Sequence, residues 1–146
     1  MTEDRKLEEL EIIAWARLLK VSTRLLDVVE RELKAAGLPQ LAWYDALLEL
    51  HRAGKAGLRP ADLQKEMLLP QYNVSRLIDR LEGAGYAVRI PHPEDGRGQV
   101  LQITEAGRVL IRRMWRVYRR TVAENFASKL GKGDAGRLAE LLKPLL

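Results

Sequence analysis

The sequence predicts a mainly α-helical fold that includes one small β-hairpin, which places it in the α+β class. Both ends of the chain repeat apolar residues at the spacing of an amphipathic helix. Residues 59–82 contain two short helical stretches separated by a turn, and residues 87–90 and 99–103 have the β-branched composition of two strands around a loop. Helix, turn, helix and hairpin in this order form a winged helix-turn-helix lobe, which we expect at residues 41–103.

Length and composition limit what the chain can be. Its 146 residues suit a single domain over residues 1–146. The 25 Lys and Arg residues exceed the 20 Asp and Glu residues only modestly, so contact with a polyanion requires a local basic patch. The absence of cysteine excludes disulfides, thiolate metal sites and thiol redox sensors. We find no signal peptide and no uninterrupted apolar stretch of about 18 residues, so we expect a cytoplasmic protein without a membrane partner.

The N-terminal helix is expected over residues 5–36. Its apolar stripe consists of Leu7, Leu10, Ala14, Leu18, Val21, Leu25, Val28 and Leu33, and the sequence Gly37, Leu38, Pro39 ends it. About thirty residues at 1.5 Å each make a rod of roughly 45 Å. A compact lobe of this size has a radius of gyration of only about 15 Å and cannot cover such a rod. Part of the stripe therefore needs a second chain.

The C-terminal segment, residues 105–146, leads to the same conclusion. Thr104 can cap a helix that begins at Glu105, glycines at 131 and 133 end it, and Asp134 can cap a last helix. Two helical arms that flank one lobe favour a homodimer, with residues 5–36 and 105–146 as its dimerisation helices. The alternative is a monomer whose arms fold back on their own lobe.

The helix-turn-helix is expected to start at Pro60, because a proline at a first helical position lacks only an N–H that would be unpaired there. A second proline, Pro70, opens the next helix, predicted over residues 70–82. Its apolar residues Val74, Leu77, Ile78 and Leu81 share one face, which must be buried. The opposite face, at about 100° per residue, carries Tyr72, Arg76 and Asp79, flanked by Asn73, Ser75 and Arg80. These polar side chains are available to a ligand outside the fold.

The chain resembles the MarR family of bacterial transcriptional regulators over nearly its whole length. The matching motifs are Trp-Tyr-Asp-Ala-Leu-Leu at 43–48, Val-Ser-Arg-Leu-Ile-Asp-Arg-Leu-Glu at 74–82, and Asp-Gly-Arg-Gly at 95–98 with Thr-Glu-Ala-Gly at 104–107. The resemblance implies a homodimer that binds a pseudo-palindromic operator, usually as a repressor, and releases it when a small molecule binds. It also implies that residues 70–82 are the recognition helix, that Arg97 is the wing arginine that enters the minor groove, and that Asp95 holds this arginine by a salt bridge. Two departures are Gly96, where the family often has a further arginine, and Pro70, where a capping serine is frequent.

The residue types on the outer face suit DNA independently of the resemblance. An α-helix fits the major groove, where Arg can bind guanine and Asn or Gln can bind adenine. The candidates for base contact are therefore Arg76, Gln71 and Asn73, while Tyr72 and Ser75 can reach a phosphate or a thymine methyl. Arg97 suits a narrow A·T-rich minor groove, and we expect Arg80 and Arg89 on phosphates. Dimer symmetry would place two half-sites about one helical turn apart.

An effector site is implied by the resemblance, in the cleft between the dimerisation arms and the winged lobe. The candidate residues there are Trp15, Arg17, Trp43, Tyr44, Asp45 and His51. A tryptophan beside an arginine or histidine suits an aromatic or anionic acid. The alternative for each of these residues is a place in the core of an amphipathic helix.

Other function classes find little support in the sequence. The two histidines are His51 and His92, and the group His92, Glu94 and Asp95 lacks the spacing of a known metal site. We therefore expect no catalysis, no metal and no cofactor. The rival function is a winged-helix protein-protein interaction module, or a regulator that has lost its effector response. A protein-binding face should be apolar at Tyr72, Arg76 and Asp79, and this one is polar.

Overall fold

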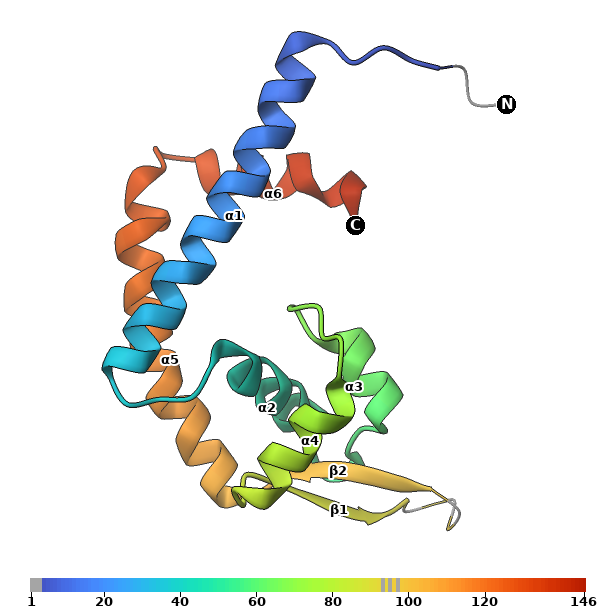
Figure 1. Cartoon of the computed structure of the whole chain (residues 1–146). Coiled ribbons are helices and arrows are strands. Elements are labelled where there is room, and N and C mark those ends of the chain that lie inside the picture. Colours follow the sequence, from blue (N-terminus) through green and yellow to red (C-terminus); the bar gives the residue numbers. More distant parts are fainter. Residues whose placement is uncertain (1–3, 93, 95, 97) are drawn as a thin grey trace.

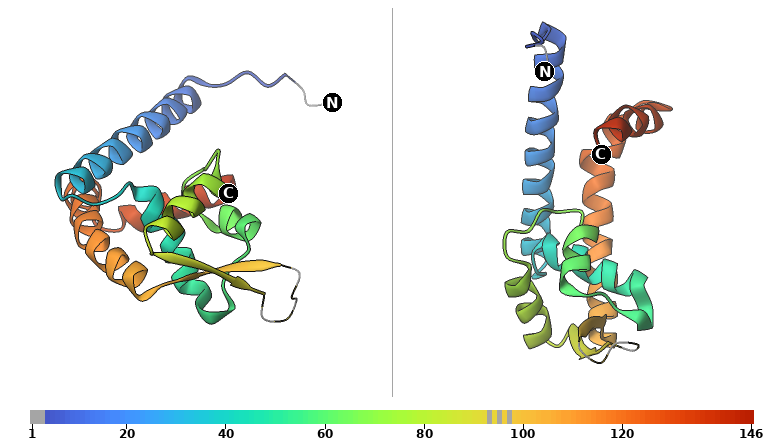
Figure 2. Two further views of the ribbon diagram at one scale, coloured as in Figure 1. Left: turned by 60° about the horizontal axis from the view of Figure 1, so that its bottom comes forward. Right: turned by 90° about the vertical axis from the view of Figure 1, so that its right-hand side faces the viewer.

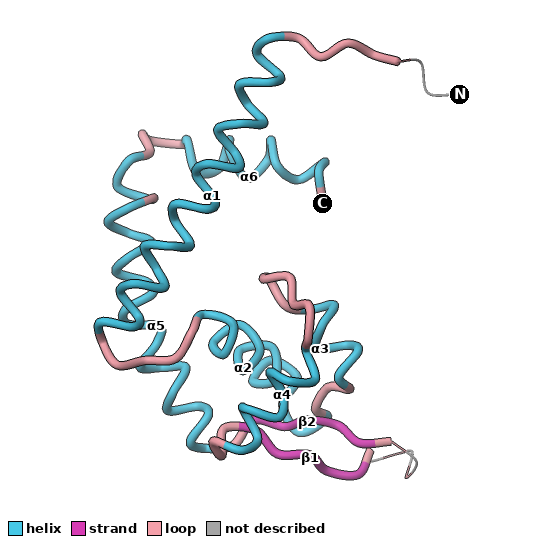
Figure 3. The backbone as a smooth tube through the Cα atoms, viewed as in Figure 1, coloured by secondary structure: helices cyan, strands magenta, loops and turns pink. Residues whose placement is uncertain are grey.

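The computed structural model describes residues 4–92, 94, 96 and 98–146. Its elements confirm the predicted fold class and follow the predicted order (Figures 1 and 3). They are α1 (Glu9–Ala35), α2 (Leu41–Ala53), η1 (Gly54–Ala56), α3 (Pro60–Glu66), α4 (Val74–Gly83), β1 (Ala87–Pro91), β2 (Gln99–Ile103), α5 (Glu105–Asn125), η2 (Ala127–Lys129), α6 (Asp134–Leu142) and η3 (Lys143–Leu145). The helices α1 and α5 lie side by side and extend away from a lobe made of α2, α3, α4 and the hairpin (Figures 1 and 2).

The first helix leaves most of its apolar stripe uncovered. It begins at Glu9, later than predicted, because Glu8 and Glu11 form a capping box at this point. Within α1 the buried residues are Val29 and Leu33, both close to the lobe. Most apolar residues of its first half are exposed, among them Leu10 at 76%. Only the C-terminal third of this helix is therefore buried, mainly against α5.

The core sits where α2, α3, α4, β2 and α5 meet. Its most deeply buried side chains are Leu33, Leu47, Leu50, Leu63, Ile78, Leu81, Leu101 and Met114. Residues from α4 and from α5 share this cluster, so the helix-turn-helix and the second long helix pack as one body.

A third segment of the chain is bonded to the hairpin at the middle of β2. β1 pairs with β2 in antiparallel register from Ala87 opposite Ile103 to Pro91 opposite Gln99. Leu58, just before α3, exchanges two backbone hydrogen bonds with Leu101, at 3.0 and 2.8 Å between nitrogen and oxygen. Gly57 has a φ of 65°, and a Cβ there would lie 2.5 Å from the Leu101 carbonyl oxygen. Glycine is therefore required for this close approach.

The start of α5 confirms the predicted cap. Thr104 Oγ1 accepts a hydrogen bond from the backbone N–H of Gly107 at 3.1 Å and donates one to the Gly85 carbonyl at 2.7 Å. The prediction for the last helix was wrong in detail, because Gly133 precedes α6 as its cap and Asp134 is its first helical residue. The Asp134 side chain accepts from the Gly131 N–H at 2.8 Å and so closes the turn before the helix.

A carboxylate joins the first two helices. The amide N–H of Leu41, the first residue of α2, donates to Oε1 of Glu30 on α1 at 2.8 Å. No side chain of the preceding residue, Gln40, caps α2. Glu30 thus satisfies an amide that would otherwise be unpaired at this helix start.

Candidate nucleic-acid interface

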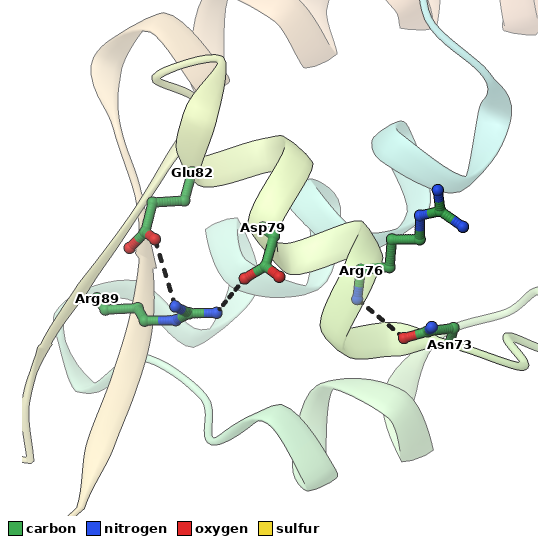
Figure 4. Close-up of polar contacts among 5 residues, drawn as sticks. All are labelled: Asn73, Arg76, Asp79, Glu82 and Arg89. Atoms are coloured by element: carbon green, nitrogen blue, oxygen red, sulfur yellow. Dashed lines mark hydrogen bonds and ion pairs between the residues drawn. The ribbon is translucent and has the colours of Figure 1, made fainter.

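The helix predicted to be the recognition helix starts four residues later than expected. α4 begins at Val74 and not at Pro70, because Asn73 Oδ1 accepts the N–H of Arg76 at 3.0 Å and so caps it (Figure 4). Upstream, the N–H groups of Leu68 and Leu69 donate to the two carboxylate oxygens of Asp45, at 2.9 and 2.6 Å. These two N–H groups therefore bind a side chain and not a helical carbonyl. Residues 70–72 therefore form an irregular approach to α4 and not its first turn.

The predicted division of α4 into an apolar and a polar face is present. Leu77, Ile78 and Leu81 are buried at 7%, 1% and 0% exposure. The exposed residues of the outer face are Ser75, Arg76, Asp79 and Arg80. Tyr72, just ahead of the helix, is fully exposed, and Gln71 is half-buried. The side chains with base-contacting chemistry lie outside the fold, as the sequence predicts.

Asn73 has less hydrogen-bonding capacity for DNA than the sequence suggests. Two-point binding of adenine uses both the carbonyl oxygen and the amide nitrogen of an asparagine. In Asn73 the oxygen Oδ1 is already engaged by the Arg76 N–H. Because Oδ1 caps the helix, the amide nitrogen of Asn73 is the group that can bind DNA.

Arg89 lies on β1 and is paired with α4. Its Nη2 is 2.8 Å from Asp79 Oδ1 and its Nη1 is 3.4 Å from Glu82 Oε1 (Figure 4). The Arg89 side chain is one-third exposed. From the sequence we expected this arginine to bind a phosphate, because the residues of β1 do not indicate that Arg89 lies beside carboxylates of α4.

The wing tip is described in part. The predicted wing residues Asp95 and Arg97 lie outside the described residues. At the base of the tip, the N–H of His92 donates to the Gly98 carbonyl at 2.8 Å, and His92 Nδ1 accepts from the Glu94 N–H at 3.1 Å. Among the described residues no group of three His, Cys, Asp or Glu side chains could hold a metal ion.

A cavity of about 530 Å³ opens between the linker that follows α1, the end of α4 and the middle of α5. It is lined by Gly37, Leu38, Pro39, Gln40, Trp43, Arg80, Tyr86, Leu110 and Arg113. Trp43 meets Tyr86 edge-on in its wall, with 6.0 Å between ring centroids. Two arginines beside two aromatic rings form a cationic and aromatic lining. Arg80, assigned from sequence to a phosphate, belongs to this cavity.

The other predicted effector residues are not brought together there. Asp45 is buried and bound to the turn after α3, and His51 is exposed. Trp15 and Arg17 are exposed on the outer half of α1, with Trp15 about 20 Å along the helix from Val29. Sequence reasoning missed Arg113, Tyr86 and Leu110. The available signal was the spacing of Leu110 and Arg113, which puts both on one face of α5.

Tyr44 belongs to an aromatic cluster on the other side of α2. Its ring centroid lies 6.2 Å from that of Trp115 and 5.5 Å from that of Tyr118, both on α5. Burial raises the pKa of Tyr44, and the charge of Tyr118 raises it further. Burial, together with the charge of Asp45, also raises the pKa of Tyr118. Both phenols are therefore held in the neutral form by their surroundings.

Comparisons with known proteins agree with this geometry. A model of the MarR family matches residues 36–98. Over 136 residues, the chain is 24% identical to the multiple antibiotic resistance protein MarR of Escherichia coli K12, and 93% of each protein is covered. Sco3205, a MarR family transcriptional regulator from Streptomyces coelicolor solved in complex with DNA, superposes with a TM-score of 0.88 at 25% identity, covering 99% of this chain and 91% of that one. The chain therefore matches the MarR family of transcriptional regulators in sequence over residues 36–98 and in fold over nearly its whole length.

The relatives named here are transcriptional regulators, and the chain shares their fold. Its fold is also that of BpsR from Bordetella bronchiseptica, whose DNA binding is regulated by 6-hydroxynicotinic acid. The two superpose with a TM-score of 0.78 at 18% identity, covering 97% of each chain. Within the described part of the chain, none of the helices has the length and apolar character needed to cross a membrane.

Proposed function

We propose that this regulator binds a pseudo-palindromic operator as a homodimer, represses transcription there, and releases the DNA when an anionic aromatic molecule binds. The observation that carries the proposal is the division of α4 into two faces: one is apolar and buried, and the other is exposed and carries Ser75 and Arg76. Because its partner is chromosomal DNA, we also propose that it acts in the cytoplasm.

The proposed DNA contacts fall into three groups. Arg76 reads a base in the major groove, with Gln71 and the amide nitrogen of Asn73 as further base contacts. Tyr72 and Ser75 reach the phosphate backbone or a thymine methyl. Arg97, with Asp95 beside it, is proposed for the minor groove from the family resemblance.

The proposal of a homodimer is supported by uncovered apolar surface. Leu10 and Trp15 on α1 are 76% and 62% exposed, and Leu141 and Leu145 at the C-terminal end are 73% and 72% exposed. Large apolar side chains exposed on both arms suit an interaction surface. A second copy would cover both arms and present two recognition helices in twofold symmetry.

The proposal of an effector is supported by the cavity of about 530 Å³. Its size is that of a small-ligand site. Arg80 and Arg113 can bind a carboxylate, while Trp43 and Tyr86 can contact an aromatic ring. BpsR supplies a precedent in this fold for regulation by an aromatic acid. An occupant here would contact α4 directly through Arg80, so that binding can bias the helix that reads DNA.

Electrophoretic mobility shifts against genomic fragments, with salt titrated, test the DNA proposal. We expect tight complexes on a few fragments, and a plot of log affinity against log salt with a slope of several units. Uniform weak shifts on all fragments would instead indicate that the lobe binds proteins or has lost its operator. Arg76→Gln should weaken the tight complexes and leave the weak ones unchanged.

A further inference from the structure

The guanidinium of Arg89 spans two carboxylates on the recognition helix. Asp79 and Glu82 are three residues apart and share one side of α4 (Figure 4). Arg89 Nη2 contacts Asp79 at 2.8 Å and Nη1 contacts Glu82 at 3.4 Å. The two nitrogens of one planar group thus bind two successive turns of α4.

The charges at this site disfavour a phosphate. One positive charge faces two negative charges, so the three side chains carry a net charge of −1 when all are ionised. The Asp79 side chain is 66% exposed and lies on the outer face of α4. A phosphate that approached Arg89 would have to displace Asp79 and would then meet an unpaired carboxylate. The arginine is therefore poorly placed as a DNA contact.

The same ion pairs fix the helix relative to the wing. α4 is joined to β1 by the short turn at its C-terminal end, where the Tyr86 N–H donates to the Leu81 carbonyl at 2.9 Å. Asp79 lies midway along the helix, so its bond to Arg89 adds a second point of attachment nearer to Arg76. The ion pair therefore adds to the core packing of Leu77, Ile78 and Leu81 in fixing the direction of the helix.

We propose that Arg89 is a positioning residue: it holds the recognition helix against the wing strand through Asp79 and Glu82, and it makes no bond to DNA. This inference rests on the proposed function, in which α4 reads an operator. Because exposed ion pairs contribute little to folding stability, loss of the pair should affect DNA binding far more than the melting temperature.

The test measures operator affinity and its salt dependence for wild type, Arg89→Gln, Arg89→Lys, Asp79→Asn and the Asp79→Asn/Arg89→Gln double variant. Loss of one phosphate contact should reduce the slope of log affinity against log salt by about 1. We expect Arg89→Gln to bind about tenfold more weakly with an unchanged slope. Arg89→Lys should bind almost as weakly, because an ammonium group cannot span both carboxylates but can still bind a phosphate.

The double variant separates the two roles of the arginine. If Arg89 acts through Asp79, removal of both partners should weaken binding no more than Arg89→Gln alone. Additive losses, a slope reduced by about 1, or recovery of wild-type affinity in Arg89→Lys would each overturn the positioning role.

Two controls keep the outcomes distinct. Arg52→Gln removes an exposed arginine that pairs with Glu49 within α2, in the same lobe, and should leave operator affinity unchanged. Circular dichroism and melting curves establish that every variant is folded. If the wild-type protein binds no fragment selectively, the proposed function fails. If the wild type binds selectively while Arg89→Gln alters the salt slope, only the positioning role fails.

Discussion

The Asp45 carboxylate on α2 accepts the backbone N–H of Leu69, with 2.6 Å between Oδ2 and the nitrogen. Its other oxygen accepts the Leu68 N–H, so one buried side chain fixes the turn between α3 and α4. Hydrogen bonds to a charged group contribute more than neutral ones. We predict that Asp45→Ala lowers the free energy of unfolding by about 3 kcal/mol in urea denaturation.

Asp62→Ala is the matched control for Asp45→Ala. Asp62 is an exposed aspartate in the first turn of α3, in the same lobe. Its removal should cost less than about 1 kcal/mol, the contribution of a helix-terminal charge. Equal losses in the two variants would show that the turn does not depend on the buried carboxylate.

Gly107 and Gly136, both inside helices, should respond in opposite ways to the addition of a methyl group. A Cβ on Gly107 would lie 2.3 Å from the Tyr86 carbonyl oxygen, whereas a Cβ on Gly136 meets nothing within 4 Å. Gly107→Ala should lower the free energy of unfolding by about 2–3 kcal/mol, because backbone must move. Gly136→Ala should raise it by about 0.5–1 kcal/mol through helix propensity. A neutral result at Gly107 in urea denaturation would contradict the close approach of α5 to the hairpin.

Stability should fall at alkaline pH because the folded state keeps Tyr44 and Tyr118 protonated. Their pKa values are raised above the reference value of 10.0 by burial. Above that reference value the folded state binds more protons than the unfolded state, so the free energy of unfolding declines as pH rises further. Below it, the contribution is fully present.

Urea denaturation between about pH 8 and about pH 11 measures this dependence. Tyr118→Phe should flatten part of the decline. Tyr72→Phe, at a fully exposed position, is the matched control and should leave the profile as in the wild type. An unchanged slope in Tyr118→Phe would exclude this phenol as a source of the decline.

The cavity should prefer an anionic aromatic compound over its neutral analogue. Titration with benzoate, followed by tryptophan fluorescence, should show saturable binding, and benzamide should bind more weakly because it cannot form charge-assisted bonds. Arg113→Gln should weaken benzoate binding by about tenfold. Arg116→Gln, an exposed arginine of the same helix that does not line the cavity, is the control. Equal binding of both compounds would count against an acid as effector.

A charge in the apolar stripe of α1 should prevent assembly. In the double variant Leu10→Glu/Leu18→Glu, two exposed apolar side chains of α1 become carboxylates, which are costly to bury at an interface. Sedimentation at micromolar concentration should show a dimer for the wild type and a monomer for this variant. Leu68→Glu alters an exposed apolar residue of the lobe and should remain dimeric. A monomeric wild type would contradict the homodimer proposal.

Local signals in the sequence were enough to predict the elements themselves. Pro60 at the first position of α3 and Thr104 at the cap of α5 lie where their chemistry requires, because each acts within one helical turn. The apolar spacing of Leu77, Ile78 and Leu81 identified the buried face of α4. Periodicity and capping determine such features without reference to the rest of the chain.

The features that could not be predicted depend on residues far apart in sequence. Asp45 and Leu69 are 24 positions apart, and their bond explains why the chain does not become helical at Pro70. Arg89 and Asp79 belong to different elements, and only their packing turns a cation that suits a phosphate into a partner of α4. The cavity combines a linker, the end of one helix and the middle of another. Apart from the helical spacing of Leu110 and Arg113 in the cavity, none of these contacts produces a repeating pattern in the sequence.

The hydrogen bond from the first amide of α2 to Glu30 connects α1 directly to α2 and so restrains the linker between them. We therefore expect a tilt of α1 to move α2, whose Asp45 binds the chain just ahead of α4. Residues of the same linker line the cavity. A molecule bound in the cavity would therefore contact the linker that determines the angle between α1 and the lobe.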